Sequence, residues 1–108
     1  MEEINNKEKI LEILQNNSAV LIYFAGTNCR VCEVLRPKIE KEVSENFSKI
    51  KQIYVNSTLN LDITSYFNIF SNPTILVYFE NREFKRYGRN ISLDIFNQEI
   101  KRLYEMVF

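Results

Sequence analysis

Two cysteines separated by two residues are the side chains in this sequence best suited to covalent chemistry. Cys29 and Cys32 enclose Arg30 and Val31, and the chain has no other cysteine and no histidine. If a helix begins at the first cysteine, this spacing places both sulfurs on one face, one turn apart. Two thiols at that separation can form a disulfide, break it and form it again. The pair therefore predicts a redox site.

Zinc binding is the competing use of such a pair. A structural zinc site takes four ligands, usually cysteine and histidine, so this chain would need carboxylates or a second subunit to complete one. Residues 1–7 are acidic and polar where a signal peptide would be basic and then apolar, so we expect a cytoplasmic protein. In that reducing compartment a cysteine pair is more often catalytic than structural. We expect no metal and no bound cofactor.

Length and charge limit the class of protein. A chain of 108 residues predicts a single domain, residues 1–108, large enough to bury a core. Its 14 basic and 14 acidic residues balance, which argues against broad affinity for nucleic acid or anionic membranes. No apolar run approaches the roughly 18 residues of a membrane span. We therefore expect no nucleic-acid or membrane partner. We also expect a monomer.

The elements that must position the cysteines are a strand before them and a helix after them. Residues 19–24 form an apolar run that predicts a buried strand. Residues 31–47 predict a long helix that contains Pro37, where we expect a kink. The apolar positions of this helix recur at helical spacing, at Val31, Leu35, Ile39, Val43 and Phe47.

The remaining pattern alternates strands with helices and then adds a hairpin. It predicts a short edge strand at 2–5, a helix ending near 16–17, a strand at 50–55, a helix at 61–67, a strand at 74–79, a turn at 80–83, a strand at 84–87, and a last helix capped by Ser92. This order predicts an α/β protein with a central mixed β-sheet and helices on both faces. We assign the phenylalanines to the core, namely Phe67, Phe70, Phe79, Phe84 and Phe96.

Several motifs together resemble the thioredoxin family over nearly the whole chain. They are Phe24-Ala25 before the cysteine loop, Cys29 with Cys32, Pro37 five residues further on, Asn72-Pro73-Thr74 before a strand, and Gly88. The resemblance implies a thioredoxin-like fold and a cis peptide bond at Pro73. It also implies that Asn28, Asn72, Pro73 and Gly88 border a substrate groove.

The departures from the family pattern concentrate around the cysteines. The family's Trp-Cys-Gly-Pro-Cys is here Asn28-Cys29-Arg30-Val31-Cys32. Tyr23 replaces a buried aspartate of the family, and Tyr54 replaces the buried lysine beside it. The loss of the aspartate and the loss of the lysine are expected to occur together, because removing only one of them would leave a buried unpaired charge at a cost of about 3–5 kcal/mol. The loss bears on the resolving step, in which the family's aspartate helps to deprotonate the second thiol.

The residues assign different roles to the two cysteines. The helix N-terminus and Arg30 both favour a thiolate at Cys29, so we predict a lowered pKa for this nucleophile. Cys32 is the resolving cysteine, and Arg30, Val31 and Tyr23 tune the pair. A thiolate stabilised by Arg30 makes the disulfide more oxidising, unless Arg30 points into solvent and is screened. We also group Arg89 with Arg30 in a basic groove rim, which would favour acidic partners.

The cysteine pair and the family resemblance are compatible with two functions. The first is a thiol–disulfide oxidoreductase that reduces protein substrates, with electrons supplied, by resemblance, from a thioredoxin reductase or similar donor. The alternative is a non-catalytic protein-binding module of thioredoxin fold with vestigial cysteines. A redox adaptor specific for one partner stands between them. The lost family residues favour the module, whereas retention of both cysteines and Pro73 favours the enzyme.

Overall fold

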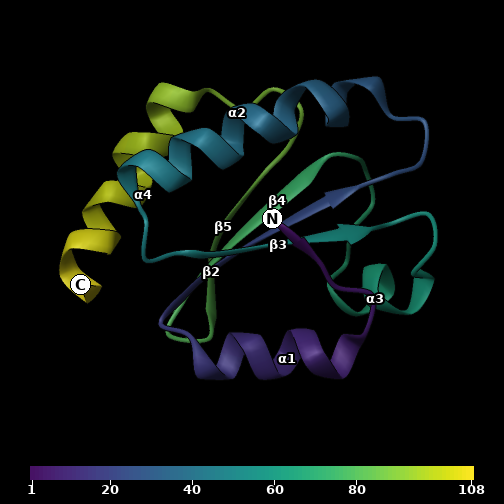
Figure 1. The fold of residues 1–108 in the computed structure, drawn as a ribbon, viewed down its shortest axis with the longest axis horizontal. Helices are drawn as coiled ribbons and strands as arrows, with labels where there is room; N and C mark the ends of the chain where they lie inside the picture. The colour runs from purple at the N-terminus through teal and green to yellow at the C-terminus, as the bar shows by residue number, and fades with distance from the viewer.

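The computed structural model describes residues 1–108 and contains one five-stranded sheet in the order β1-β3-β2-β4-β5 (Figure 1). β1, β2 and β3 run parallel, and β4 and β5 are antiparallel to their neighbours, so the sheet is mixed as predicted. In chain order the elements are β1 (Glu2–Glu3), α1 (Lys7–Asn16), β2 (Ala19–Ala25), α2 (Arg30–Asn46), β3 (Lys51–Asn56), α3 (Leu61–Tyr66), β4 (Thr74–Phe79), β5 (Arg82–Tyr87) and α4 (Leu93–Val107).

The helices cover both faces of the sheet, as the sequence predicts. Figure 1 shows α2 and α4 on one side of the strands and α1 and α3 on the other. Two hydrophobic clusters fill the space between these layers, one under each pair of helices. None of the helices is long and apolar enough to cross a membrane.

β2 is the central strand, and all seven of its residues are buried. Successive side chains of a strand point to opposite faces, so the strand contributes to both clusters. Leu21 and Tyr23 belong to the cluster beneath α2 and α4, whereas Ile22 and Phe24 belong to the other. A continuous apolar run is the sequence expected of such a strand, because neither of its faces meets water.

α2 begins one residue earlier than the sequence predicts and runs through Pro37. Ile39 and Val43 are buried against the sheet, and Phe47 is buried just beyond the helix end. Val31 differs from the other apolar positions of this helix, because 40% of its surface is exposed. It lines a surface hollow and does not pack into the core.

The core assignment of the phenylalanines is wrong at two positions. Phe67, Phe79 and Phe96 are buried, but Phe70 is 91% exposed and Phe84 is 38% exposed. Phe70 lies in the loop between α3 and β4, where no helix covers it. Phe84 lies on β5 at the border of the sheet, where its ring makes a T-shaped contact with the ring of Phe79.

The hairpin between β4 and β5 has a tighter turn than predicted. Glu80 and Asn81 both have positive φ, 51° and 62°, which is the backbone of a two-residue hairpin turn. β5 therefore starts at Arg82, two residues before the predicted start. β1 is shorter than predicted and ends at Glu3, while the other boundaries lie within about two residues of their predicted positions.

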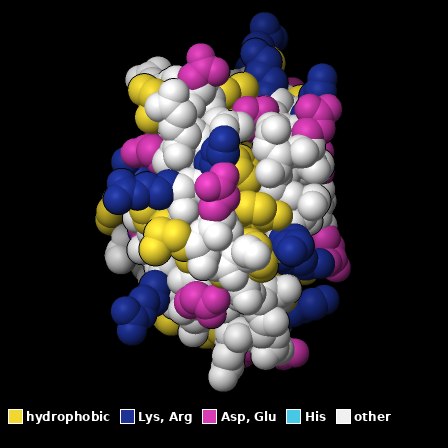
Figure 2. Space-filling view, turned by 90° about the vertical axis from the view of Figure 1, so that its left-hand side faces the viewer, with side chains coloured by type: hydrophobic (Ala, Val, Ile, Leu, Met, Phe, Trp, Pro, Cys, Tyr) yellow, Lys and Arg dark blue, Asp and Glu magenta, His cyan; other side chains and the backbone are white.

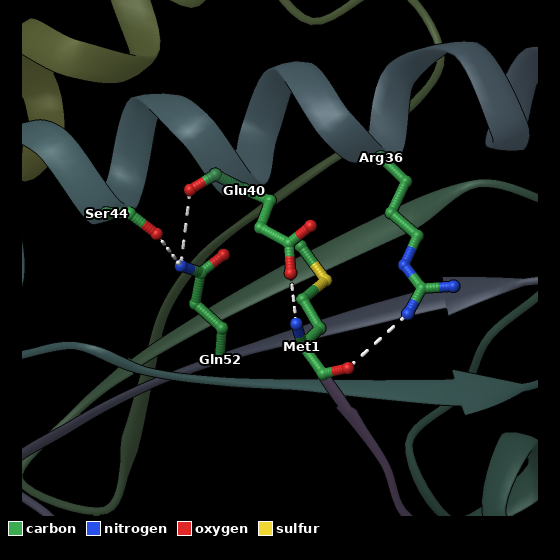
Figure 3. Close-up of polar contacts among 5 residues, drawn as sticks. All are labelled: Met1, Arg36, Glu40, Ser44 and Gln52. Carbon is green, nitrogen blue, oxygen red and sulfur yellow. Dashed lines mark hydrogen bonds and ion pairs between the residues drawn. The ribbon is translucent and has the colours of Figure 1, made fainter.

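Polar contacts attach the first residue and β3 to the underside of α2 (Figure 3). The amino group of Met1 forms an ion pair with Glu40, and its carbonyl oxygen accepts a 3.4 Å hydrogen bond from Arg36. The side-chain amide of Gln52 donates to the carbonyl oxygen of Glu40 and to the hydroxyl of Ser44. α2, which begins at the cysteine pair, is thus held to the sheet by polar as well as apolar contacts.

Candidate functional site

The loop that carries the cysteines meets the loop that carries the proline at one end of the sheet. β2 ends at Ala25, and the antiparallel β4 begins at Thr74, which pairs with Phe24. A Cβ atom on Gly26 would lie 2.8 Å from the amide nitrogen of Asn72. A larger residue at position 26 would therefore have to displace the side chain of Asn72, which shows how closely the two loops approach each other.

Cys29 and Cys32 form a disulfide at the start of α2, with their Cα atoms 5.3 Å apart. Cys29 is the N-cap residue, and its sulfur accepts a 3.3 Å hydrogen bond from the backbone N–H of Cys32. Cys29 is half-buried, whereas Cys32 is only 3% exposed. Cys29 is therefore the more accessible cysteine of the pair, and the partial positive charge at the helix N-terminus favours a thiolate there.

The peptide bond between Asn72 and Pro73 is cis. Pro73 is buried, and Asn72 is half-buried with a side-chain oxygen that has no hydrogen-bond partner. The hydroxyl of Thr74 donates a 2.7 Å bond to the carbonyl oxygen of Ser71 across this turn. The amide of Asn72 is the polar group of this turn that lies against the cysteine loop, at Gly26.

The other predicted groove residues lie around the same end of the sheet. Asn28 directly precedes the pair, is exposed and has a left-handed backbone, with φ of 57°. Gly88 follows β5 and lines a hollow together with Ser71, next to Asn72. The last residue of β5, Tyr87, pairs with Ile75, which places Gly88 at the proline end of β4.

Tyr23 lies directly beneath the cysteine pair. Its side chain is fully buried, and its hydroxyl donates a 2.7 Å hydrogen bond to the carbonyl oxygen of Cys32. Its ring stacks on Tyr54, with the ring centroids 6.3 Å apart. Burial raises the pKa of Tyr23 to about 12, although the charge of Arg36 lowers it somewhat. Tyr23 is therefore a neutral hydrogen-bond donor at physiological pH and cannot accept a proton from a thiol.

Arg36 is a site residue that the sequence reading missed. Figure 3 shows it reaching from α2 toward the sheet, and its guanidinium carbon lies 4.0 Å from the ring centroid of Tyr54. It lines a hollow of about 450 Å³ together with Cys32 and Glu33, and it is the only cation there. Its position four residues after Cys32, on the same helix face, is the sequence signal that could have identified it.

A second hollow, on the other side of the cysteine helix, is called here the basic groove. It measures about 520 Å³ and lies between α2 and the segment that joins β5 to α4. Arg30 and Arg89, which the sequence groups at the groove rim, both line it, and the structure adds Lys38. Apolar side chains form its floor, among them Val31, Val34 and Ile91.

Metal ligands are not gathered anywhere in the structure. No group of three or more cysteine, aspartate or glutamate side chains is close enough to hold an ion.

Comparison with known sequences gives a consistent result over most of the chain. The sequence model of the thioredoxin family matches residues 2–102. The thioredoxin-like protein YdfQ of Bacillus subtilis is 24% identical over 98% of this chain and 96% of its own length. The thioredoxin of Mycoplasma genitalium is 30% identical over 88% of this chain and 96% of its own length.

Comparison with solved structures shows the same fold. Oxidised mitochondrial thioredoxin 3 from Saccharomyces cerevisiae superposes with a TM-score of 0.82 at 16% identity, covering 94% of each chain. Thioredoxin from Trypanosoma brucei brucei superposes with a TM-score of 0.83 at 18% identity, covering 95% of this chain and 89% of its own. At these identities the likeness concerns the fold alone.

Proposed function

Because this chain belongs to the thioredoxin family, we propose that it reduces disulfide bonds in protein substrates through a cycle of Cys29 and Cys32. Family membership and a cysteine pair that forms a disulfide support thiol–disulfide exchange in general. The observation that carries the more specific proposal is the asymmetry of the pair. Cys29 is accessible at a helix N-terminus, and Cys32 is buried one turn later.

The first step is attack by the thiolate of Cys29 on one sulfur of the substrate disulfide. The substrate S–S bond breaks, its second sulfur leaves as a thiolate, and a mixed disulfide forms at Cys29. The backbone N–H of Cys32, which points at the Cys29 sulfur, stabilises negative charge there before the attack. Arg30, which is exposed beside it, adds a weaker and salt-screened contribution.

The second step is attack by Cys32 on the sulfur of Cys29. The mixed disulfide breaks, the substrate sulfur that was bonded to Cys29 leaves as a thiolate, and the Cys29–Cys32 disulfide forms. Two electrons have then passed from the protein to the substrate. An external dithiol donor, by family likeness a thioredoxin reductase or a similar protein, has to return them.

The substrate segment would lie between the two loops that meet at the pair. The backbone of Asn72, before the cis bond to Pro73, offers an edge to which an extended segment can add as a strand. Asn28 and Gly88 border this edge. We assign the activity to a monomer in the cytoplasm, where reducing donors keep such a pair turning over.

A second candidate is a protein-binding module or a redox adaptor for one partner. The observation that favours it is the neutral Tyr23 beneath Cys32, because no buried carboxylate is present there to take the proton of the resolving thiol. In the module, the loops would bind a partner and the disulfide would serve no reaction.

Trapping the mixed disulfide tests the two candidates. We expect Cys32→Ser to accumulate a covalent complex with a disulfide-bonded protein, and Cys29→Ser to form none, as judged by non-reducing electrophoresis and mass spectrometry. The redox equilibrium of the wild-type pair is measured in graded thiol buffers, and a potential near or below about −230 mV would suit a cytosolic reductant. The proposal fails if the pair shows no reversible transition or if neither variant forms a complex.

A further inference from the structure

We propose that the basic groove binds an acidic and apolar segment of the protein substrate, so that it selects which disulfides reach Cys29. The inference rests on the proposed function and specifies the substrate class for the same site. The groove begins at Arg30 and Val31, the two residues between the cysteines. A segment seated there is connected to the reacting disulfide by only a few residues.

The groove continues toward the proline loop. A neighbouring hollow of about 630 Å³ shares Arg89 and Ile91 with it and is also lined by Gly88 and Ser71. Ser71 immediately precedes the Asn72–Pro73 bond. The two hollows therefore form a track from the first turns of α2, past Arg89, to the loop on which an extended substrate can pair.

Charge is the first property that defines the ligand. The cations of the groove are Arg30, Lys38 and Arg89, all exposed, and no carboxylate residue lines it. The ion pairs of the structure all involve other residues, so these three charges are not neutralised within the chain. Because the whole chain has no net charge, the positive potential is a local property of this groove.

The opposite end of the molecule gives a contrast. Figure 2 views the end away from the cysteine loop, and there lysine and arginine side chains alternate with aspartate and glutamate. A surface of mixed charge attracts neither sign strongly. That end therefore offers acidic partners no basic surface comparable with the groove.

The floor of the groove defines the second property. Val31 is 40% exposed and Val34 is 55% exposed, and both lie beside the cations. An aliphatic side chain of the ligand would cover them, while flanking acidic side chains reach the rim. No aromatic residue lines the groove, so stacked bases of a single-stranded nucleic acid would find no platform there. The geometry points to a protein segment.

The test compares two peptide disulfides in single-turnover reduction by the pre-reduced protein. The peptides share one cystine and one leucine, and differ in having aspartates or lysines around the leucine. Exposed charges contribute modestly, so we expect the acidic peptide to react about five- to tenfold faster at low ionic strength. We expect the preference to disappear at about 0.5 M salt, where the Debye length is only a few ångströms.

Paired variants locate the preference on the surface. We expect Lys38→Gln/Arg89→Gln to reduce the ratio of the two rates to near one. The control Lys9→Gln/Arg82→Gln removes the same charge from exposed positions outside the groove and keeps the wild-type ratio. Val34→Asn tests the floor, because it should slow the acidic peptide but not an acidic peptide that lacks the leucine.

Each outcome separates this inference from the proposed function. Reduction of a small neutral dialkyl disulfide by the wild-type protein, measured alongside, tests the exchange chemistry without the groove. If that reaction proceeds while the two peptides react equally, or while both double variants lower the ratio alike, the groove proposal is wrong. If neither the small disulfide nor either peptide is reduced, the proposed function itself is wrong.

Discussion

The hydroxyl of Tyr23 donates a 2.7 Å hydrogen bond to the carbonyl oxygen of Cys32, and this bond joins the central strand to the first turn of the cysteine helix. Both residues are buried. A neutral donor occupies the place where, by family likeness, an aspartate would stand. The contact therefore positions Cys32 without placing a charge beneath it.

Alkaline titration tests this contact. Burial raises the pKa of Tyr23 and of Tyr78 to about 12, so both should ionise late in a titration followed by tyrosinate absorbance. Their folded-state pKa values lie above the unfolded value of about 10. The stability that the neutral forms contribute is thus complete below about pH 10 and is lost as the pH rises toward about 12.

Tyr23→Phe provides the matched variant. It removes one hydrogen bond from a buried site and should lower the free energy of unfolding at neutral pH by about 1 kcal/mol. One late tyrosine should also vanish from the titration. If the variant is as stable as wild type, and the tyrosine that it lacks is one that ionised near the ordinary pKa of about 10, the hydroxyl is not engaged.

Arg36 should govern the resolving step. Its cation lines the hollow at Cys32, where it favours the thiolate that attacks the mixed disulfide. We expect Arg36→Gln to slow resolution on the order of tenfold at neutral pH, equivalent to about 1.4 kcal/mol, and to move the pH midpoint of this step upward. Arg36→Lys should restore most of the rate. The rate of resolution is measured as the release of the second thiol from a chromogenic disulfide.

A charge-matched control makes the Arg36 experiment specific. Lys41→Gln removes an exposed cation from the same helix, and Lys41 does not line the hollow at Cys32. Equal rates in Arg36→Gln and Lys41→Gln would argue against a role of Arg36 in the resolving step.

Phe67 and Phe70 should respond differently to the same substitution. Phe67 is 5% exposed and contacts the rings of Phe24 and Tyr78, so Phe67→Ala should cost about 3–5 kcal/mol of stability. Phe70 is 91% exposed, so Phe70→Ala should change stability by less than about 0.5 kcal/mol. Urea unfolding of the two variants measures both effects, and similar losses would contradict the exposed placement of Phe70.

Acidic pH should weaken the hydrogen-bonded contact between β5 and the end of α3. Hydrogen bonds from Arg86 lower the pKa of Glu83, and Arg86 also donates to the carbonyl oxygens of Phe67 and Asn68. Because the folded pKa of Glu83 is depressed, the stability it contributes is present above its usual pKa of about 4.5 and is lost as the pH falls through the folded value.

Unfolding measured from about pH 6 to pH 3 tests this pair. Glu83→Gln should be less stable than wild type at pH 6, and the difference should narrow as the pH falls. A difference that stays constant across this range would show that the charge of Glu83 is not involved.

Local patterns in the sequence were sufficient for the parts of this protein that depend on near neighbours. The apolar run at 19–24 predicts the buried strand, and the spacing of Cys29 and Cys32 predicts one helical turn between them. Ser92 caps the last helix as predicted, because a side-chain cap depends only on the residues that follow it. The resemblance to the thioredoxin family added the cis peptide bond at Pro73, which periodicity does not contain.

Only the tertiary structure decided which distant residues share a surface. Arg36 contacts Tyr54, and Lys38 lines the same hollow as Arg89, because α2 crosses the sheet at one particular position. Phe70 resembles a core residue in the sequence, yet it lies in a loop that no helix covers. Local sequence determines which face of an element is apolar, but its partner depends on how helices and strands of the whole chain pack together.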